Sequence, residues 1–347
     1  MPERSNTQII LAKRPVGEVQ NTDFQFQESV IPALGENGIL LQNLLIALDP
    51  ALRSWMDDFD GSYIPPVQLG AVMSAVCLSR VVESRNPDFP VGTIVRGLAG
   101  WEHYTIAGAD GARQVPGLEI VQVDEGIPLS YYLSICGTTG LTSYFGMLRV
   151  GQPRSGDTIV ISGAAGAVGS VAGQIAKNNV DCRVVGIAGS AEKCRWLTEE
   201  LGFDVAINYR ETADMTSALR DACPQGIDVF FDNVGGEILE AALLNLAMGA
   251  RIVMCGTISN YNNDVDDRSG PENMWQLLVK NARIEGFTVA YYGAEWAQTT
   301  LKLAQMVKSG ELKHREQIVD GLDNTIDTFR GLFVGANHGR LMVKLAD

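Results

Sequence analysis

Three evenly spaced glycines, Gly163, Gly166 and Gly169, follow a short run rich in β-branched residues. The pattern G-x-x-G-x-x-G is a relative of the dinucleotide fingerprint G-x-G-x-x-G, in which glycine lets the backbone turn tightly and approach a pyrophosphate. The N–H groups at the start of the following helix then hold the phosphate charge. A bare triplet could equally reflect close packing of a helix on a strand. Here a strand-like run precedes it and a helical stretch follows, which favours nucleotide binding.

The residues after the second strand of this region indicate which dinucleotide is bound. NAD-binding folds usually carry Asp or Glu there, about 20 residues after the glycines, to hold the ribose hydroxyls. This chain has Ala188–Ser190 followed by Lys193, and a small polar turn next to a cation suits the 2′-phosphate of NADP. The missing carboxylate also argues against FAD. Lys193 could instead be an ordinary solvated lysine, Arg195 is an equally near cation, and Tyr209 could reach the phosphate or the adenine.

Polar residues at the ends of two later strands could face the nicotinamide. Asn233 follows the fourth strand and Cys255–Tyr261 the fifth, and ligands of open parallel sheets lie beyond the carboxyl ends of the strands. Without a metal, hydride transfer to a carbonyl compound needs a donor for the substrate oxygen, and a tyrosine hydroxyl can supply it. Tyr261 is the leading candidate for this catalytic role. Tyr63, beside two prolines, could bind substrate from the first domain or simply pack.

Other catalytic arrangements are missing from the sequence. The three histidines, His103, His314 and His338, lie in no HExxH or GHE pattern of a zinc enzyme, so we expect no metal. The chain has no Gly-x-Ser-x-Gly elbow, and its glycine-rich turn lacks the Gly-Lys-Ser/Thr of a Walker loop. These observations argue against serine hydrolase and P-loop chemistry.

The elements that would position these residues alternate regularly between strand and helix. The expected strands are Thr158–Ser162, Arg183–Ile187, Val205–Asn208, Ile227–Asp232, Arg251–Cys255 and Ile284–Val289. The expected helices between them are Ala167–Asn178, Ala191–Leu201, Met215–Ala222, Ile238–Leu246 and Glu272–Asn281. Uniformly apolar strands joined by helices predict an α/β fold, a doubly wound parallel Rossmann sheet of about six strands.

The chain before residue 130 has a different character. Short apolar runs such as Ile39–Leu48 and Val72–Val82 are separated by Gly, Pro, Asp and Asn, which predicts a small, partly antiparallel β domain. After the amphipathic stretch Glu295–Lys308, short elements return and end in the strand-like Arg340–Leu345. The expected domains are therefore 1–130 with the returning segment 311–347, and a dinucleotide-binding domain over 131–310.

Composition limits the kind of protein. The chain has 347 residues, of which 46% are hydrophobic, and its 41 acidic and 27 basic residues give a net charge of −14. Such a surface repels phosphate backbones, which disfavours nucleic-acid binding. No run of about 18 or more apolar residues is present, so no membrane span is expected. The six scattered cysteines, without a CxxC pair, suit reduced thiols in the cytoplasm.

Taken together, these segments resemble the zinc-independent branch of the medium-chain dehydrogenase/reductases. Within that branch they are most similar to the prostaglandin reductase and alkenal double-bond reductase family, with its curcumin-reductase-like bacterial members. The resemblance covers almost the whole chain. It rests on the motifs LDPALRSWM at 48–56, GSYIPP at 61–66, ISGAAGAVGS at 161–170, GIAGSAEK at 186–193, INY at 207–209, FDNVGG at 231–236, CGTISNY at 255–261, IEGF at 284–287 and NHGR at 337–340.

The resemblance implies a GroES-like, mainly β, partly open barrel as the first domain, a Rossmann domain, NADPH as cofactor and a homodimer. It implies that the Gly166, Ala167, Val168 and Gly169 backbone holds the pyrophosphate. Lys193 and Tyr209 would contact the 2′-phosphate end, and Asn337 would close over the cofactor. The residues implied to line the nicotinamide side are Asn233, Cys255, Gly256, Thr257, Ile258, Ser259, Tyr261, Phe287, Thr288 and Val289.

Two residues depart from the family pattern. Ala51 stands where many plant and mammalian members have tyrosine, so their substrate pocket cannot be assumed for this chain. His338 stands where a smaller or apolar residue is more usual.

The main functional hypothesis is NADPH-dependent reduction of the carbon–carbon double bond of α,β-unsaturated ketones or aldehydes. Hydride would reach the β-carbon, and Tyr261 would hold the resulting enolate oxygen. One rival is a related enzyme that reduces quinones or dehydrogenates an allylic or secondary alcohol. A second rival, from another class, is a non-catalytic NADPH-binding protein with a sensing or structural role.

Overall fold

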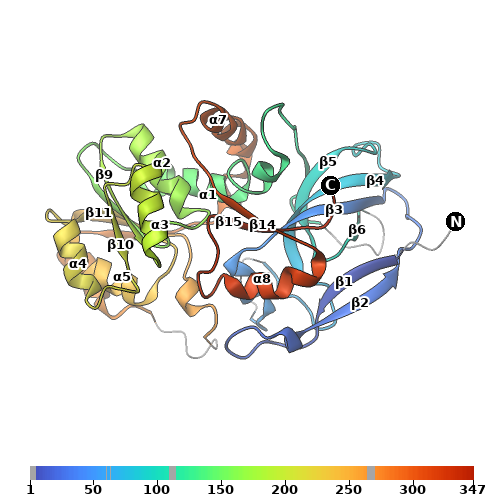
Figure 1. The fold of residues 1–347 in the computed structure, drawn as a ribbon, viewed down its shortest axis with the longest axis horizontal. Coiled ribbons are helices and arrows are strands. Elements are labelled where there is room, and N and C mark those ends of the chain that lie inside the picture. Colours follow the sequence, from blue (N-terminus) through green and yellow to red (C-terminus); the bar gives the residue numbers. More distant parts are fainter. Residues whose placement is uncertain (1–4, 60, 63, 109–114, 264–269) are drawn as a thin grey trace.

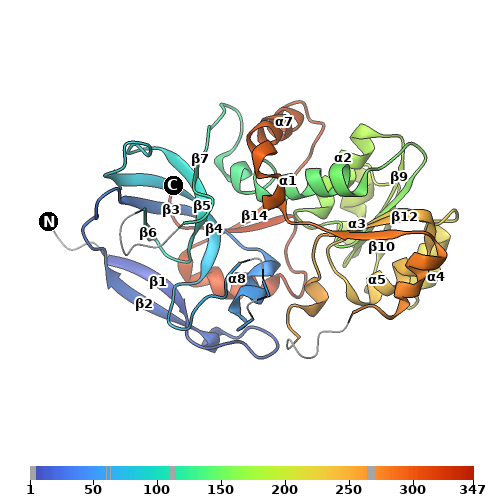
Figure 2. The ribbon, with the colours of Figure 1, turned by 180° about the vertical axis from the view of Figure 1, so that it is seen from behind.

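The structure is a computed structural model that describes residues 5–59, 61–62, 64–108, 115–263 and 270–347. The chain forms two lobes, each built on one large β-sheet, and Figures 1 and 2 show them from opposite sides. Strands β14 (Glu316–Asp320) and β15 (Arg340–Lys344) lie between the lobes in Figure 1. The last part of the chain therefore passes through the middle of the molecule.

The lobe built from the middle of the chain contains a parallel sheet of six strands in the order β10-β9-β8-β11-β12-β13. All neighbouring strands in it are parallel. Their bounds are β8 Thr158–Ile161, β9 Arg183–Ala188, β10 Val205–Asn208, β11 Ile227–Asp232, β12 Leu246–Met254 and β13 Arg283–Gly286. In chain order this is 3-2-1-4-5-6, the strand order of a dinucleotide fold. The predicted Rossmann sheet is confirmed.

Helices cover both faces of this sheet. The helices of the chain are α1 Thr138–Phe145, α2 Gly169–Asn179, α3 Ala191–Arg195, α4 Met215–Ala222, α5 Gly236–Leu243, α6 Trp275–Val279, α7 Trp296–Lys308 and α8 Thr325–Gly331. Successive strand residues point to opposite faces, so Ile159 and Ile161 pack toward α1, α2 and α7, whereas Val160 packs toward α4 and α5. No helix among the described residues is long and apolar enough to cross a membrane.

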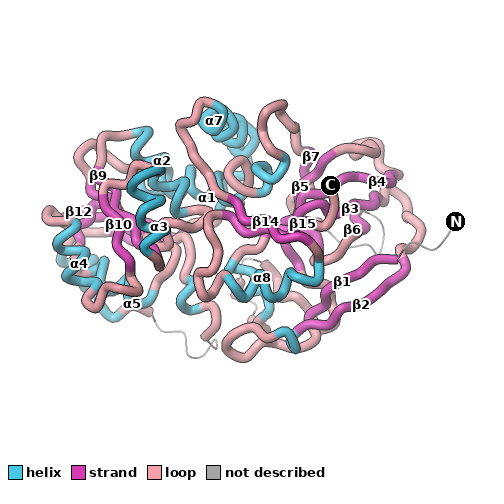
Figure 3. The backbone as a smooth tube through the Cα atoms, viewed as in Figure 1, coloured by secondary structure: helices cyan, strands magenta, loops and turns pink. Residues whose placement is uncertain are grey.

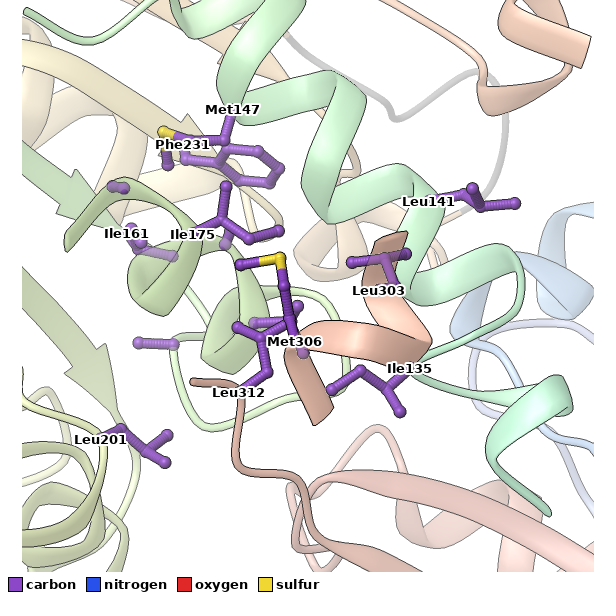
Figure 4. Packing of buried hydrophobic residues seen from close by; sticks show 14 of the residues in the cluster. Ile135, Leu141, Met147, Ile161, Ile175, Leu201, Phe231, Leu303, Met306 and Leu312 are labelled. Atoms are coloured by element: carbon purple, nitrogen blue, oxygen red, sulfur yellow. The ribbon is translucent and has the colours of Figure 1, made fainter. Parts of the chain in front are cut away.

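The cluster beneath α1, α2 and α7 is the larger core. Figure 4 shows Ile161 and Phe231 of the sheet beside Ile175 of α2 and Met147 just after α1. These four side chains are completely buried. Fully buried side chains of this size each contribute roughly 1.5–3 kcal/mol of hydrophobic stabilisation. This core therefore holds the sheet firmly against α1, α2 and α7.

The second sheet has seven strands, in the order β14-β15-β3-β4-β5-β7 with β6 beside β3. The remaining bounds are β3 Ile39–Ala47, β4 Ser74–Ser84, β5 Ile94–Gly100, β6 Tyr104–Ala107 and β7 Glu119–Ile120, and a separate ribbon pairs β1 Ser5–Leu11 with β2 Phe24–Val30. Figure 3 shows how strands dominate this lobe. The mainly β domain is confirmed, and the domain boundaries at 130 and 310 stay predictions.

Several element boundaries differ from the sequence-based predictions. The helix after the glycines begins at Gly169 rather than Ala167, because residues 163–168 form the turn itself. The helix expected to reach Leu246 ends at Leu243, since the Asn245 side chain bonds to the Ala241 carbonyl at 2.8 Å and Leu246 already belongs to β12. The last strand ends at Gly286, and a 3₁₀ helix starts at Val289.

Candidate functional site

The glycine-rich turn brings the backbone close to itself at the carboxyl end of β8. Gly163 has a φ of +58°, in the left-handed region that favours glycine. A Cβ on Gly169 would lie 2.6 Å from the Gly163 carbonyl oxygen, so a larger residue would displace the backbone. Gly166 N donates to Gly163 O at 3.0 Å. The turn therefore leads straight into α2 with little side-chain cover, as a pyrophosphate requires.

Lys193 lies in a half-buried corner at the end of β9. The Ser190 hydroxyl caps α3 by accepting a hydrogen bond from Lys193 N at 3.2 Å. The ammonium Nζ donates to the carbonyl of Gly335 at 2.7 Å. Burial lowers the pKa of Lys193, the Arg210 guanidinium lowers it further, and Glu192 acts in the opposite direction. A phosphate dianion in this corner would relieve the repulsion between the two cations. Lys193 is thus not the solvated lysine of the alternative interpretation, whereas Arg195 is exposed.

Arg210 is a candidate that sequence reasoning missed. Its Nη2 donates to the carbonyl of Val334 at 2.6 Å, next to the residue that holds Lys193. The preceding Tyr209 packs its ring over Gly189, where a Cβ would lie 2.8 Å from Tyr209 Cε1. The available signal was a second cation directly after the third strand, at the same edge of the sheet as Lys193. The structure therefore brings Lys193 and Tyr209 together, as predicted, and adds Arg210.

A buried carboxylate, Asp232, organises the loop after β11, which was predicted to face the nicotinamide. Its oxygens accept hydrogen bonds from Ser162 Oγ at 2.7 Å, Val234 N at 3.0 Å and Gly235 N at 3.0 Å. Burial raises the pKa of Asp232, and these hydrogen bonds oppose the rise. Asn233 is fixed in turn, because its Nδ2 donates to Ser162 O at 2.7 Å. Neither Asp232 nor Ser162 was singled out from the sequence, since nothing in a strand's last residue shows that its side chain will be buried.

The loop after β12 lies against the loop after β11. Gly256 N donates to Asp232 O at 3.1 Å and Ser259 Oγ donates to Val234 O at 2.7 Å. Within this loop the Tyr261 hydroxyl oxygen accepts a hydrogen bond from Thr257 N at 3.3 Å. The two predicted segments, Asn233 and Cys255–Tyr261, are therefore joined at one place on the sheet edge.

Cys255 opens this loop but is not a nucleophile. Burial raises the pKa of its thiol to about 12, and the Asp232 carboxylate adds to the rise. Since the thiolate is the reactive form, this cysteine stays protonated at neutral pH. At this site Cys255 therefore contributes only a small, neutral side chain.

The remaining predicted residues are more loosely connected to this edge. The Phe287 ring packs against the helical segment Gly146–Gly151, which follows α1. A Cβ on Gly146 would lie 2.6 Å from Phe287 Cζ. Thr288 precedes the 3₁₀ helix that starts at Val289. Asn337 Nδ2 donates to Gly339 O at 2.9 Å, so it braces its own loop. Tyr63 lies outside the described residues, and its role in substrate binding stays a prediction.

The described part of the chain contains no group of three or more His, Cys, Asp or Glu placed to hold a metal ion. What it does contain is a glycine turn, a cation pair and a hydrogen-bonded pair of loops, all at the carboxyl ends of adjacent parallel strands. These parts define a dinucleotide-binding site of the Rossmann kind.

Comparisons with known proteins agree with this site. Residues 7–115 match the family described as the N-terminal domain of oxidoreductase, and residues 167–306 match the family described as zinc-binding dehydrogenase. The NADPH-dependent curcumin reductase of Escherichia coli is 39% identical over 99% of this chain and 98% of its own. The NADP⁺-dependent 2-alkenal reductase of Nicotiana tabacum is 36% identical over the same shares.

A solved structure extends the comparison to three dimensions. The crystal structure of CurA from Vibrio vulnificus in complex with NADPH superposes with a TM-score of 0.90, at 37% identity, over 98% of this chain and 99% of that one. The chain belongs to the medium-chain dehydrogenase/reductases, in their zinc-independent reductase family. It is an oxidoreductase, and the sequence-based recognition of the family is confirmed.

Proposed function

We propose that this enzyme uses NADPH to reduce the carbon–carbon double bond of α,β-unsaturated ketones or aldehydes. The observation that carries the proposal is the alignment of three features along one sheet edge: the glycine turn, the Lys193–Arg210 pair and the loop that bears Tyr261. The relatives named for curcumin and 2-alkenal reduction support the substrate class.

The residues at the adenosine end fit the phosphorylated dinucleotide. Two cations converge where NAD-binding folds usually place a carboxylate, and burial together with their mutual repulsion lowers the pKa of Lys193. In this proposal the Gly166–Gly169 backbone holds the pyrophosphate, Lys193 and Arg210 hold the 2′-phosphate, and Tyr209 lies beside the adenosine. When bound, NADPH supplies the hydride that is added to the β-carbon of the enone, and a proton from water would complete the reduction at the α-carbon.

The protein's own contribution to the chemistry is placement and hydrogen bonding. The loops braced by Asp232 hold Asn233 and Tyr261 at fixed positions, so the residues that would contact the substrate are already ordered before it binds. The Tyr261 O–H donates a hydrogen bond to the carbonyl oxygen as negative charge develops on it. Stabilisation of that kind is worth about 2.7–4 kcal/mol for a single donor in well-studied enzymes. Holding the reacting carbons at near-attack distance adds to this effect.

A panel of substrates tests the proposal. Purified protein with NADPH would be offered 4-phenyl-3-buten-2-one, an alkenal, a benzoquinone and, with NADP⁺, an allylic alcohol. We expect NADPH consumption with the first two and recovery of the saturated ketone or aldehyde by mass spectrometry. Turnover with the quinone or the alcohol alone would instead favour the related rival activities. Tight NADPH binding without turnover of any compound would favour a sensing role.

We also propose that the enzyme is a homodimer joined through β13. This strand ends the parallel sheet, and within the described residues only β12 pairs with it. Arg283 and Glu285 are both about half exposed. If two copies of β13 paired antiparallel, centred on Ile284, Arg283 of each copy would lie opposite Glu285 of the other. Nearby Leu278 and Tyr291 are each 85% exposed, which favours a covered surface. Light scattering after size exclusion tests this: we expect twice the chain mass, and a monomer for Ile284→Pro.

As the location of the enzyme we propose the cytoplasm, because all six cysteines are free thiols in the structure and free thiols suit a reducing compartment. Fractionation of the native cells would test this location.

A further inference from the structure

Residues 334–340, called the strap here, connect α8 to β15 and touch the candidate site at three places. At one end, the carbonyls of Val334 and Gly335 accept hydrogen bonds from Arg210 and Lys193. The strap therefore covers the corner proposed for the 2′-phosphate.

The middle of the strap rests on the glycine-rich turn. Gly339 N donates to Ala165 O at 3.2 Å, and Gly339 forms a parallel bridge with Gly166. Gly339 has a φ of +66°, and a Cβ there would lie 2.1 Å from the carbonyl oxygen of Arg315. Gly339 is therefore held between the backbone of Arg315 on one side and the glycine-rich turn on the other.

The far end of the strap reaches the N-terminal part of the chain. Arg340 donates from Nη2 to Asp49 Oδ2 at 3.1 Å, and its Nη1 pairs with the other carboxylate oxygen. Asp49 stands at the start of the 3₁₀ segment Pro50–Met56, which contains Ala51. The Arg340 side chain is only 2% exposed, so the bidentate pair with Asp49 is what makes its burial tolerable.

The cation corner can hold a phosphate and the strap at the same time. A lysine ammonium has three N–H donors and a guanidinium has five, so each can serve a phosphate oxygen while keeping its bond to a strap carbonyl. Without the anion the two cations repel each other in a half-buried place. With it, their repulsion is neutralised and the strap gains a firmly held anchor.

We propose that the strap carries recognition of the 2′-phosphate to the segment 49–56, which we propose lies beside the enone, with Arg340 as its positioning residue. The proposal rests on the function proposed above and deepens it. The phosphorylated dinucleotide fixes the Lys193–Arg210 end, the strap stays seated on the glycine turn, and Arg340 then holds Asp49 and the segment after it in the shape that receives the enone. The unphosphorylated dinucleotide leaves the repulsion between the two cations at the start of this chain of contacts in place.

Binding measurements on the whole enzyme test the proposal without turnover. Calorimetry would give the affinity for 4-phenyl-3-buten-2-one with saturating NADP⁺ and, separately, with saturating NAD⁺. We expect NADP⁺ to strengthen enone binding at least about fivefold more than NAD⁺ does, the lower end of common couplings between sites. In Arg340→Lys and Asp49→Asn we expect this ratio to fall to about one, while the affinity for 2′,5′-ADP changes less than about twofold.

Hydrogen exchange supplies a readout that does not depend on enone chemistry or on a variant that folds. In the wild-type enzyme, 2′,5′-ADP should slow amide exchange in residues 334–340, and 5′-ADP should not. Lys177→Met, which removes an ion pair with Asp204 elsewhere on the Rossmann domain, is the matched control and should keep the wild-type ratio. Equal exchange with both nucleotides, or an unchanged ratio in both strap variants, would overturn the proposal. If instead the enone is never reduced while 2′,5′-ADP protects the strap, the proposed function fails and the strap's link to the phosphate stands.

Discussion

The two ends of the candidate site are built in different ways. At the proposed adenosine end, charged side chains from separate elements, Lys193 and Arg210, contact a loop from the far end of the chain. At the proposed nicotinamide end, the Ser162 hydroxyl and two backbone N–H groups bond to one buried carboxylate, Asp232. The first end is suited to select a ligand by charge, and the second to hold a reacting group still. Changes at the two ends should therefore separate affinity from turnover.

The largest effect is expected from Tyr261→Phe. Loss of one donor to a developing oxyanion costs about 10²–10³ in kcat in comparable cases, whereas the affinity for NADPH should change less than about twofold because the hydroxyl does not serve the adenosine end. Steady-state kinetics with an enone and calorimetry with NADPH measure the two quantities. Tyr104→Phe, which changes a ring on β6 in the other sheet, is the matched control. Unchanged turnover in Tyr261→Phe would remove this residue from the mechanism.

Next in size is the loss of phosphate recognition. Lys193→Met or Arg210→Met should each weaken NADPH binding by about 10- to 100-fold, since hydrogen bonds to charged groups contribute roughly 1.5–3 kcal/mol. Binding of NADH should hardly change, and kcat at saturating NADPH should fall little. Arg195 lies on α3, the helix that also carries Lys193, but its side chain is exposed. Arg195→Met should therefore behave as wild type. If Arg195→Met weakens NADPH binding instead, the phosphate lies on the other side of α3.

A smaller effect is expected from pH. Burial and the neighbouring Arg210 lower the pKa of Lys193, so this residue loses its proton, and with it its attraction for a dianion, at a lower pH than an ordinary lysine. The preference for NADPH over NADH should therefore decline as the pH rises toward the usual lysine pKa of about 10.4. Lys193→Arg should keep the preference across that range, because a guanidinium stays charged. A preference independent of pH in the wild type would contradict this placement.

The smallest effect is expected at Cys255. Because burial raises the pKa of its thiol to about 12, Cys255→Ala should keep kcat within about threefold, the range of a modest packing change. Iodoacetamide should label it slowly at neutral pH, which mass spectrometry of the digested protein can follow. Rapid labelling with loss of activity would show a thiolate that the geometry does not favour.

The sequence predicts the parallel sheet well and the charged corner only in part. Uniformly apolar strands and regular helices carry their own periodicity, so a doubly wound parallel sheet of about six strands followed from counting βα units. Lys193 was found because a motif places it near the second strand. Arg210 was not, because its role depends on the carbonyl of Val334, which lies 124 residues further along the chain. Strand β14 was missed for a similar reason: three of its five residues are Glu, Gln and Asp, and only pairing with β15 makes it a strand.

Contacts that depend on burial were equally hidden. Asp232 ends an apolar strand, as many surface carboxylates do, and its sequence neighbours do not show that three donors converge on it. The strap residues Asn337 and Arg340 belong to a recognisable motif, but a motif does not say what each residue touches. The predicted roles of the site residues in cofactor and substrate binding stay predictions that the experiments above address.

The antiparallel pairing of β15 with β3 also constrains how the protein is made. Residues Met342–Lys344 are the register partners of Leu45–Ala47, so the N-terminal sheet remains unfinished while a ribosome is still producing the rest of the polypeptide. The dinucleotide-binding half, which is contiguous in the gene product, can mature first, and domains commonly do so as units. Nascent chains would thus carry an open strand edge until residues 340–344 emerge, and a chain that stops before residue 340 should be prone to aggregation.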